Sequence, residues 1–268
     1  LNTDFSPKKV FYGNLLEKLR YGENPHQKSA FYSKNKNTDI KKIHGKPLSY
    51  NNYNDIYAAL TVTKFFPKNK GTVIVKHANP SGVSILQNNL DSYKSALLCD
   101  PLSAFGGIVS CNFKITKALA LELNKIFLEV IIAKGFDKNA LKILKVKKNL
   151  RLIDATNFSL DETLKFQSVN GDILVQTEDN QVFSKSNFKV VSKRKPNKSQ
   201  LENLIFAFNV CRQVKSNAIV IASNKSTVGI GSGQPSRLDS CQIAINKMNK
   251  FVKIKDEIVA ASDAFFPF

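Results

Sequence analysis

Cysteine and histidine, two of the side chains that most often bind zinc, are scarce in this sequence, with four cysteines and three histidines among 268 residues. None of the cysteines forms a Cys-x-x-Cys pair, and no histidine stands at zinc-site spacing from them. The His-x-Glu and Pro-Cys-x-x-Cys signatures of zinc nucleobase deaminases are also absent. We therefore expect no metal cluster and no disulfide framework, and interpret the cysteines as reduced side chains that fill the core.

Long apolar runs are missing as well. No run could span a bilayer, and the first residues lack the charged and then apolar pattern of a signal peptide, so we expect a cytoplasmic protein without a membrane partner. The net charge is +19, from 40 basic and 21 acidic residues. Arginine is rare, since only five of the 40 basic residues are arginines. The lysines are scattered rather than gathered in one stripe, so we do not expect nucleic acid as a partner. A basic nucleic-acid-binding module is kept as the alternative.

Apolar runs and helical patterns alternate along the first part of the chain. Helical spacing at 55–66 precedes a strand-like run at Thr72–Lys76, and helical spacing at 116–127 precedes a second strand-like run at 129–133. Asn54 or Asp55 is the expected cap of the first of these helices. Such alternation predicts an α/β fold with a mostly parallel sheet covered on both faces.

The regular pattern is interrupted once. We predict a first α/β subdomain at 1–153, an irregular connection at 154–198 and a second α/β subdomain at 199–268. Within the connection, 172–176 and 181–185 are expected to pair as a hairpin. Beyond it, a capping box at Ser199 and Glu202 predicts the start of a helix.

The strand Thr72–Lys76 runs directly into a lysine–histidine pair. We predict a turn after it, built by Asn79–Pro80 and Gly82. Open α/β sheets bind ligands at the carboxyl ends of their strands, where His77 could exchange protons and Lys76 could pair with anions. A surface lysine beside a histidine held by loop carbonyls would explain this stretch equally well.

A glycine-rich segment, 227–237, leads to a second candidate site. Ser236 and Asp239 predict a helix cap, which puts Arg237 in the first turn of a helix. A helix N-terminus with an arginine is suited to an anion such as phosphate. The P-loop and dinucleotide-binding patterns are absent. A glycine-rich hairpin with a surface arginine is the alternative.

Six motifs occur in one order, at 20–27, 76–82, 100–107, 215–218, 229–237 and 262–268. Together they resemble the transformylase half of the AICAR transformylase/IMP cyclohydrolase family, over about residues 19–268. The resemblance implies α/β/α layers with mixed sheets and cytidine-deaminase-like subdomains. It also implies a fragment, because the chain starts at Leu1 without the cyclohydrolase domain to which the family is fused and stops at Phe268, which leaves the second subdomain C-terminally incomplete.

The resemblance implies an activity. Family members transfer a formyl group from 10-formyltetrahydrofolate to the 5-amino group of AICAR in purine (IMP) biosynthesis, without a catalytic metal. Their active site forms across a homodimer. Cyclohydrolase activity is not expected of this chain, and an inactive transformylase fragment is a further alternative.

The matching motifs also imply roles for individual residues. His77 would be the general base, Lys76 would assist it, and Asn217 would hydrogen-bond the oxygen that becomes negative. Asp263 lies near a monovalent-cation site of the family, which would hold K⁺. The residues that would hold AICAR or line the substrate and folate pockets are Arg20, Tyr21, Phe105, Gly106, Glu129, Arg237, Pro267 and Phe268.

Overall fold

The computed structural model describes residues 5–35, 38–159, 164–253 and 257–265. A nine-stranded sheet forms its centre, in the order β13-β11-β12-β5-β4-β6-β7-β8-β3. Its strands are β3 (Lys41–His44), β4 (Thr72–Lys76), β5 (Asn79–Ser84), β6 (Gly107–Cys111), β7 (Leu128–Ala133), β8 (Arg151–Asp154), β11 (Ile219–Ser223), β12 (Ser226–Gly231) and β13 (Val259–Ser262).

The sheet is mixed, as the family resemblance implies, and the mostly parallel sheet predicted from the alternation is wrong. Among the described strands of this sheet, only the pairs β6–β7 and β7–β8 are parallel. The main reason is a hairpin between β4 and β5, whose two turn residues are His77 and Ala78, with φ of 51° and 57°. Two-residue hairpin turns of this kind need positive φ at both positions. The segment Asn79–Ser84, predicted as a turn, is therefore the returning strand.

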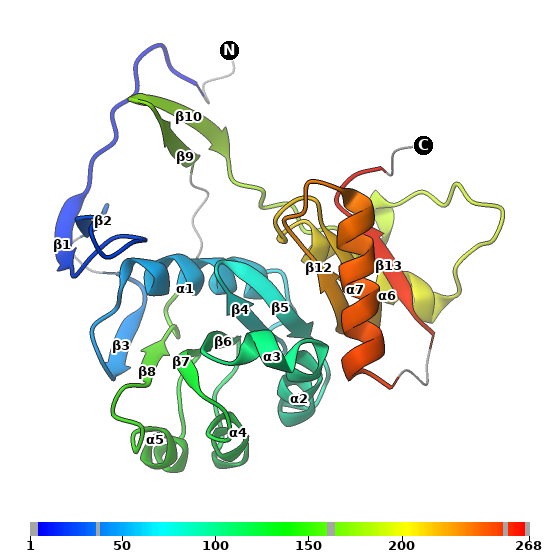
Figure 1. Ribbon diagram of the computed structural model, residues 1–268, viewed down its shortest axis with the longest axis horizontal. Coiled ribbons are helices and arrows are strands. Elements are labelled where there is room, and N and C mark those ends of the chain that lie inside the picture. Colours follow the sequence, from blue (N-terminus) through cyan, green and yellow to red (C-terminus); the bar gives the residue numbers. More distant parts are fainter. Residues whose placement is uncertain (1–4, 36–37, 160–163, 254–256, 266–268) are drawn as a thin grey trace.

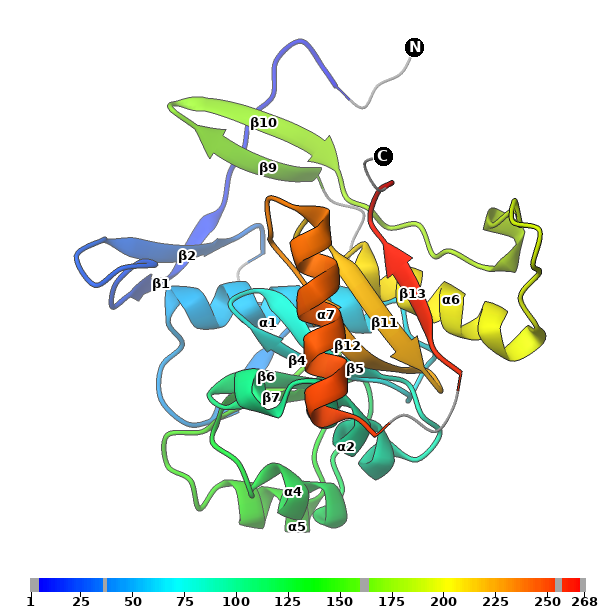
Figure 2. The same cartoon turned by 45° about the vertical axis from the view of Figure 1, so that its right-hand side comes forward.

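Helices cover both faces of the sheet, which confirms the α/β/α layering (Figures 1 and 2). Strand residues alternate between the layers: Val73 and Val75 pack in the cluster of the first face, whereas Ile74 packs in the cluster of the second. The first face carries α1 (Tyr50–Thr63) and α6 (Lys198–Cys211). The second carries α2 (Asn89–Cys99), α4 (Lys117–Leu123), α5 (Lys138–Leu144) and α7 (Arg237–Phe251), with the short α3 (Pro101–Ala104) beside α2.

Helices α1 and α6 start at reciprocal capping boxes. Helix α1 begins five residues before its predicted start, because Ser49 caps it and Asn52 returns the hydrogen bond. Helix α6 is likewise capped by Asn197 with Gln200, two residues before the predicted box. Ser236 caps α7 as predicted.

Two further hairpins lie outside the main sheet: β1 (Asn14–Leu19) with β2 (Ser29–Ser33), and β9 (Leu164–Val169) with β10 (Asp172–Thr177). The predicted partner of β10 is wrong, because residues 181–184 form no strand and a 3₁₀ turn follows at Lys185–Asn187. An Asn170–Gly171 turn connects β9 to β10, with positive φ at both residues. This hairpin stands away from the main sheet (Figure 1), and Phe166 and Leu174 are largely exposed on it.

The strands that precede the connection 154–198 meet those that follow it at a seam between β5 and β12. Backbone register is recorded there for one residue pair, Ser84 and Ser226, whose buried hydroxyls are 2.8 Å apart. The Thr227 hydroxyl accepts from the N–H of Val83 at 2.9 Å and donates to its carbonyl at 3.2 Å. A threonine side chain thus replaces a backbone pair at this seam. The proposed division into subdomains remains a prediction.

No helix in the described part of the chain has the length and apolar character needed to cross a membrane. Cys99, Cys111 and Cys211 are buried and Cys241 is half-buried, and all four are free thiols in the structure.

Candidate active site

Most of the predicted site residues gather at one edge of the main sheet. Strand β4 ends there at Lys76, and β5 begins there at Asn79. The antiparallel pairings bring the first residues of β6 and β11 and the last residues of β12 and β13 to this edge, and β7, parallel to β6, starts there too. The parallel strands therefore present their amino ends to the site, not the carboxyl ends at which open α/β sheets bind ligands.

The turn that carries His77 is held in place by a side chain of helix α1. His77 is exposed, and the carboxylate of Asp55 accepts a hydrogen bond from the N–H of Ala78 at 2.7 Å. Burial raises the pKa of Asp55, while hydrogen bonds from the backbone N–H groups of Ala78 and His77 oppose the rise. Asp55, which the sequence offers as a possible helix cap, thus holds the turn in place. The positive φ values of His77 and Ala78 are strained for residues other than glycine.

Lys76 lies against the 105–106 loop. Its Nζ donates to the carbonyl of Phe105 at 2.6 Å, and a Cβ added to Gly106 would lie 3.2 Å from the same Nζ. Gly106 has a φ of +69° and donates its N–H to the carbonyl of Phe127 at 2.8 Å. The Phe105 ring is 61 % exposed and lies 5.4 Å from that of Phe127. The glycine therefore leaves room for an ammonium group beside an exposed aromatic ring.

Glu129 lies at the start of β7, in a small polar network. Its Oε2 accepts from the buried amide of Asn52 at 2.9 Å and lies 3.7 Å from the guanidinium of Arg151. Burial lowers the pKa of Arg151, and the charges of Glu129 and Tyr21 oppose the change. Sequence reasoning missed Asn52 and Arg151, which carry no local motif.

The loop with Arg20 and Tyr21 connects β1 to β2 and reaches the same side. The Arg20 guanidinium lies 5.7 Å from the centre of the Tyr21 ring, and the carbonyl of Tyr21 accepts from the Ser29 hydroxyl at 2.6 Å. Phe31 of β2 stacks on Tyr53 of α1 with ring centres 4.1 Å apart. This stacking fixes the hairpin on the helix that also carries Asp55.

Asn217, Arg237 and Asp263 form one cluster. Arg237 is 9 % exposed; it donates to the carboxylate of Asp263 and, at 2.6 Å, to Oδ1 of Asn217. The Asn217 amide nitrogen donates to the carbonyls of Gln234 and Pro235 at 2.9 and 2.8 Å. In this arrangement Arg237 binds protein oxygens, and both amide hydrogens of Asn217 are already used.

The glycines of β12 have a packing role. A Cβ on Gly231 would lie 1.8 Å from the carbonyl oxygen of Ser240, and one on Gly229 would lie 2.2 Å from that of Ala244. Both glycines therefore let α7 lie directly on the strand. The start of this helix carries Arg237, so the close packing positions the arginine.

The cluster predicts a pH-dependent stability. Burial acts to raise the pKa of Asp263, but hydrogen bonds from Ser216, Arg237 and a backbone N–H outweigh it and lower the pKa below its usual value. A lowered carboxyl pKa adds stability above the unfolded pKa of about 3.9, and this is lost as pH falls through the folded pKa. We expect Asp263→Asn to lower the free energy of unfolding by about 1–3 kcal/mol at pH 7 and by clearly less at pH 3.

Urea unfolding at both pH values measures this difference. Asp172→Asn, on the exposed β9–β10 hairpin, is the matched control and should have little effect at either pH. An equal loss for Asp263→Asn at pH 7 and pH 3 would contradict the role of its charge.

The cation site implied at Asp263 does not fit this arrangement. Its carboxylate is bound by the Arg237 guanidinium and by the N–H of Ala218. Both contacts are to Oδ1, and a monovalent cation bound to this carboxylate would lie beside an arginine that already neutralises its charge. The described residues also contain no group of three or more His, Cys, Asp or Glu side chains that could hold a metal ion.

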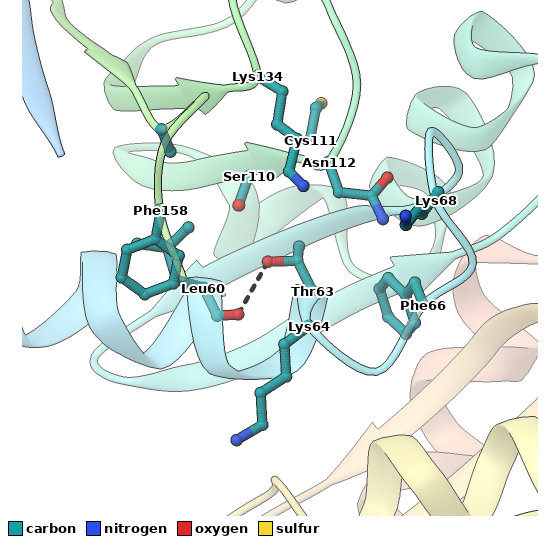
Figure 3. A pocket seen from close by; sticks show the side chains of 11 residues that line it. Leu60, Thr63, Lys64, Phe66, Lys68, Ser110, Cys111, Asn112, Lys134 and Phe158 are labelled. Carbon is teal, nitrogen blue, oxygen red and sulfur yellow. Dashed lines mark hydrogen bonds between the residues drawn. The ribbon is translucent and has the colours of Figure 1, made fainter. Parts of the chain in front are cut away.

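Two predicted residues, Pro267 and Phe268, lie outside the described residues. A separate cavity of about 250 Å³ opens at the opposite edge, where β6, β7 and β8 end (Figure 3). Lys64, Lys68 and Lys134 line it together with Ser110 and Asn112. It contains no predicted site residue.

Comparisons with known proteins agree with the motifs. Residues 2–247 match the family model of the AICARFT/IMPCHase bienzyme. The bifunctional purine biosynthesis protein PurH of Parvibaculum lavamentivorans is 45 % identical, over 97 % of this chain and 51 % of its own length. The protein of the same name from Acetivibrio thermocellus is 44 % identical, over 94 % of this chain and 50 % of its own length. The Persephonella marina protein of the same name is 46 % identical over 93 % of this chain and 50 % of its own length.

The chain thus spans about half the length of the curated relatives that it matches. The family match covers nearly all of the residues at the sheet edge described above. The chain belongs to the AICARFT/IMPCHase bienzyme family.

Proposed function

We propose that this chain carries the site that transfers a formyl group from 10-formyltetrahydrofolate to the 5-amino group of AICAR, in the biosynthesis of IMP. The observation that carries the proposal is the Lys76–His77 turn at the sheet edge, with Phe105, Glu129 and Asn217 around it, in a chain of this family. The substrate would be an anionic nucleotide, which is compatible with a net charge of +19.

In the proposed reaction His77 acts first as a base and then as an acid. The AICAR amine attacks the formyl carbon, and His77 takes a proton from the amine nitrogen. The bond between the formyl carbon and N10 of the folate then breaks, and N10 receives that proton. Because His77 is exposed on a turn fixed by Asp55, its ring can reach a bound substrate without a change in the backbone.

Asn217 is proposed to hydrogen-bond the oxygen that becomes negative. Lys76 is proposed to assist His77 electrostatically, and the carbonyl of Phe105 holds its ammonium group at the sheet edge. Asn217 gives its amide hydrogens to two carbonyls, so it can donate to the substrate only by exchanging one of these bonds.

The remaining predicted residues are proposed to bind the substrates. Glu129 offers a carboxylate and Tyr21 an aromatic ring on the AICAR side, where Arg20 would meet anionic oxygens. Phe105 and Gly106, with Pro267 and Phe268, are proposed for the substrate and folate pockets. Arg237 remains a proposed AICAR contact; in the structure its donors point to Asp263 and Asn217.

The assembly is part of the proposal. We infer a homodimer with the site at its interface, fusion to an N-terminal cyclohydrolase domain, and a cytoplasmic location. The support is the family and the length of the relatives, of which this chain covers about half.

Calorimetric titration of AICAR into the chain tests the proposal. We expect saturable binding that Glu129→Gln weakens about 10- to 100-fold, because a hydrogen bond to a charged group contributes about 1.5–3 kcal/mol. Glu202→Gln is the control, since Glu202 is exposed on α6 and pairs with Lys225. A formyl-transfer assay with 10-formyltetrahydrofolate follows. Absence of saturable AICAR binding would contradict the proposed function.

A further inference from the structure

Asn79 connects two loops that are distant in sequence. Its Oδ1 accepts a hydrogen bond from the backbone N–H of Lys215 at 3.0 Å, and its Nδ2 donates to the carbonyl of His77 at 3.3 Å. One side chain therefore contacts both the turn with the proposed base and the loop that leads to Asn217.

In the loop that leads to Asn217, both backbone groups of Lys215 form hydrogen bonds. The Lys215 carbonyl accepts from the N–H of Gly233 at 2.8 Å, while its N–H is held by Asn79. Two residues further on, Asn217 binds Arg237 through its side chain. The position of Lys215 therefore affects where the Asn217 cluster lies.

The bridge also lies where backbone pairing is absent. The recorded register between β5 and β12 is at Ser84 and Ser226, at the opposite end of β5. At the site edge, among the residues that the structure describes, Asn79 is linked to the second half of the chain by a side-chain hydrogen bond, the one from the N–H of Lys215. Asp55 holds the same turn from α1, so the turn is fixed between two elements.

The chemistry of the bridge requires an amide. It needs an acceptor for the Lys215 N–H and a donor for the His77 carbonyl on one short side chain. Asn79 precedes Pro80, which restricts the backbone of Asn79 to extended conformations and so limits the positions from which its side chain can reach these groups.

We propose that Asn79 is a positioning residue for formyl transfer, which keeps the His77 turn and the Asn217 loop at a fixed separation. The inference rests on the proposed function. Asn79 acts through the backbone of its neighbours and touches no reacting atom. Its loss misplaces the base relative to the groups that stabilise the oxyanion, and small displacements of this kind lower the rate of the chemical step more than they weaken binding.

Amide hydrogen exchange tests the bridge without any activity. In Asn79→Ala we expect the Lys215 amide to exchange about 10-fold faster, the effect of losing one hydrogen bond. In Asn79→Asp, which keeps the acceptor, the Lys215 amide should stay protected. The Ala78 amide, held by Asp55, is the internal control and should change little. Unchanged Lys215 exchange in Asn79→Ala would overturn the bridge.

Kinetics test the positioning role. Asn79→Ala should lower kcat for formyl transfer about 10- to 100-fold, while the Kd for AICAR stays within about twofold. Asn79→Asp should recover part of kcat, because it keeps one of the two bonds. Asn88→Ala is the matched control: it removes the cap of α2, lowers stability and should leave kcat unchanged.

The outcomes separate the two proposals. A wild-type chain that binds AICAR and transfers the formyl group, with an unchanged kcat in Asn79→Ala, would overturn the positioning role alone. A wild-type chain that neither binds AICAR nor transfers the group would overturn the proposed function and this role with it, whatever the exchange of Lys215 shows about the bridge.

Discussion

The variant His77→Asn is expected to lose about 10²- to 10⁴-fold in kcat for formyl transfer, the usual contribution of a general acid–base group. Asparagine tolerates positive φ better than other residues with a Cβ, so the turn with a φ of 51° at this position keeps its shape. His77 is exposed, and we expect the free energy of unfolding to change by less than about 0.5 kcal/mol. Steady-state kinetics and urea unfolding on the same preparations measure both quantities.

His44→Asn is the matched control for this experiment. His44 lies on the edge strand β3, where its ring is 3.3 Å from the carbonyl of Lys147, far along the sheet from β4. We expect its kcat to equal that of the wild type. A His77→Asn enzyme with nearly full kcat would show that another group removes the proton.

Thr227→Val is expected to lower the free energy of unfolding by about 2–6 kcal/mol. Thr227 and Val83 are both buried, and the threonine hydroxyl satisfies both backbone groups of Val83. Valine has the same shape without the hydroxyl, so it leaves a buried N–H and a buried carbonyl unpaired, each at a cost of about 1–3 kcal/mol. Urea unfolding measures the loss.

Thr227→Ser separates the hydroxyl from the methyl group. It keeps both hydrogen bonds and removes one buried methyl group, so its loss should be about 1 kcal/mol. Equal stability of the valine and serine variants would contradict the role assigned to the hydroxyl at the seam.

Sequence reasoning was most successful where a signal is local. The strand Thr72–Lys76 and the cap of α7 at Ser236 were predicted, because apolar periodicity and capping depend on neighbouring residues. The α/β/α layering was predicted from the family resemblance and is confirmed. The Asn170–Gly171 turn carried a strong hairpin signal that was missed.

The direction of the strands could not be predicted in this way. His77 and Ala78 form a tight turn although neither is a usual turn residue, whereas Asn79–Pro80 has turn composition and lies in a strand. The conformation of the turn depends on Asp55, 23 residues away from Ala78 in the chain. A tertiary contact therefore overrides the local preference.

The same limit applies to the site. Lys76 and His77 were singled out because their motif is contiguous. Asn52 binds Glu129 across 77 residues and Asn79 binds Lys215 across 136, so neither has a local pattern. Their roles depend on which strands become neighbours, and that order follows from the whole fold.

The seam between β5 and β12 also bears on how the chain is assembled. Val83 and Thr227 are 144 residues apart, so β5 remains an open edge of a sheet until β12 has been synthesised. Open edges invite pairing with other chains, and strands protect them with residues that lack a donor. Pro80 is such a residue, and it lies in this strand. We therefore expect Pro80 to weaken the pairing of this edge with other chains before β12 has formed.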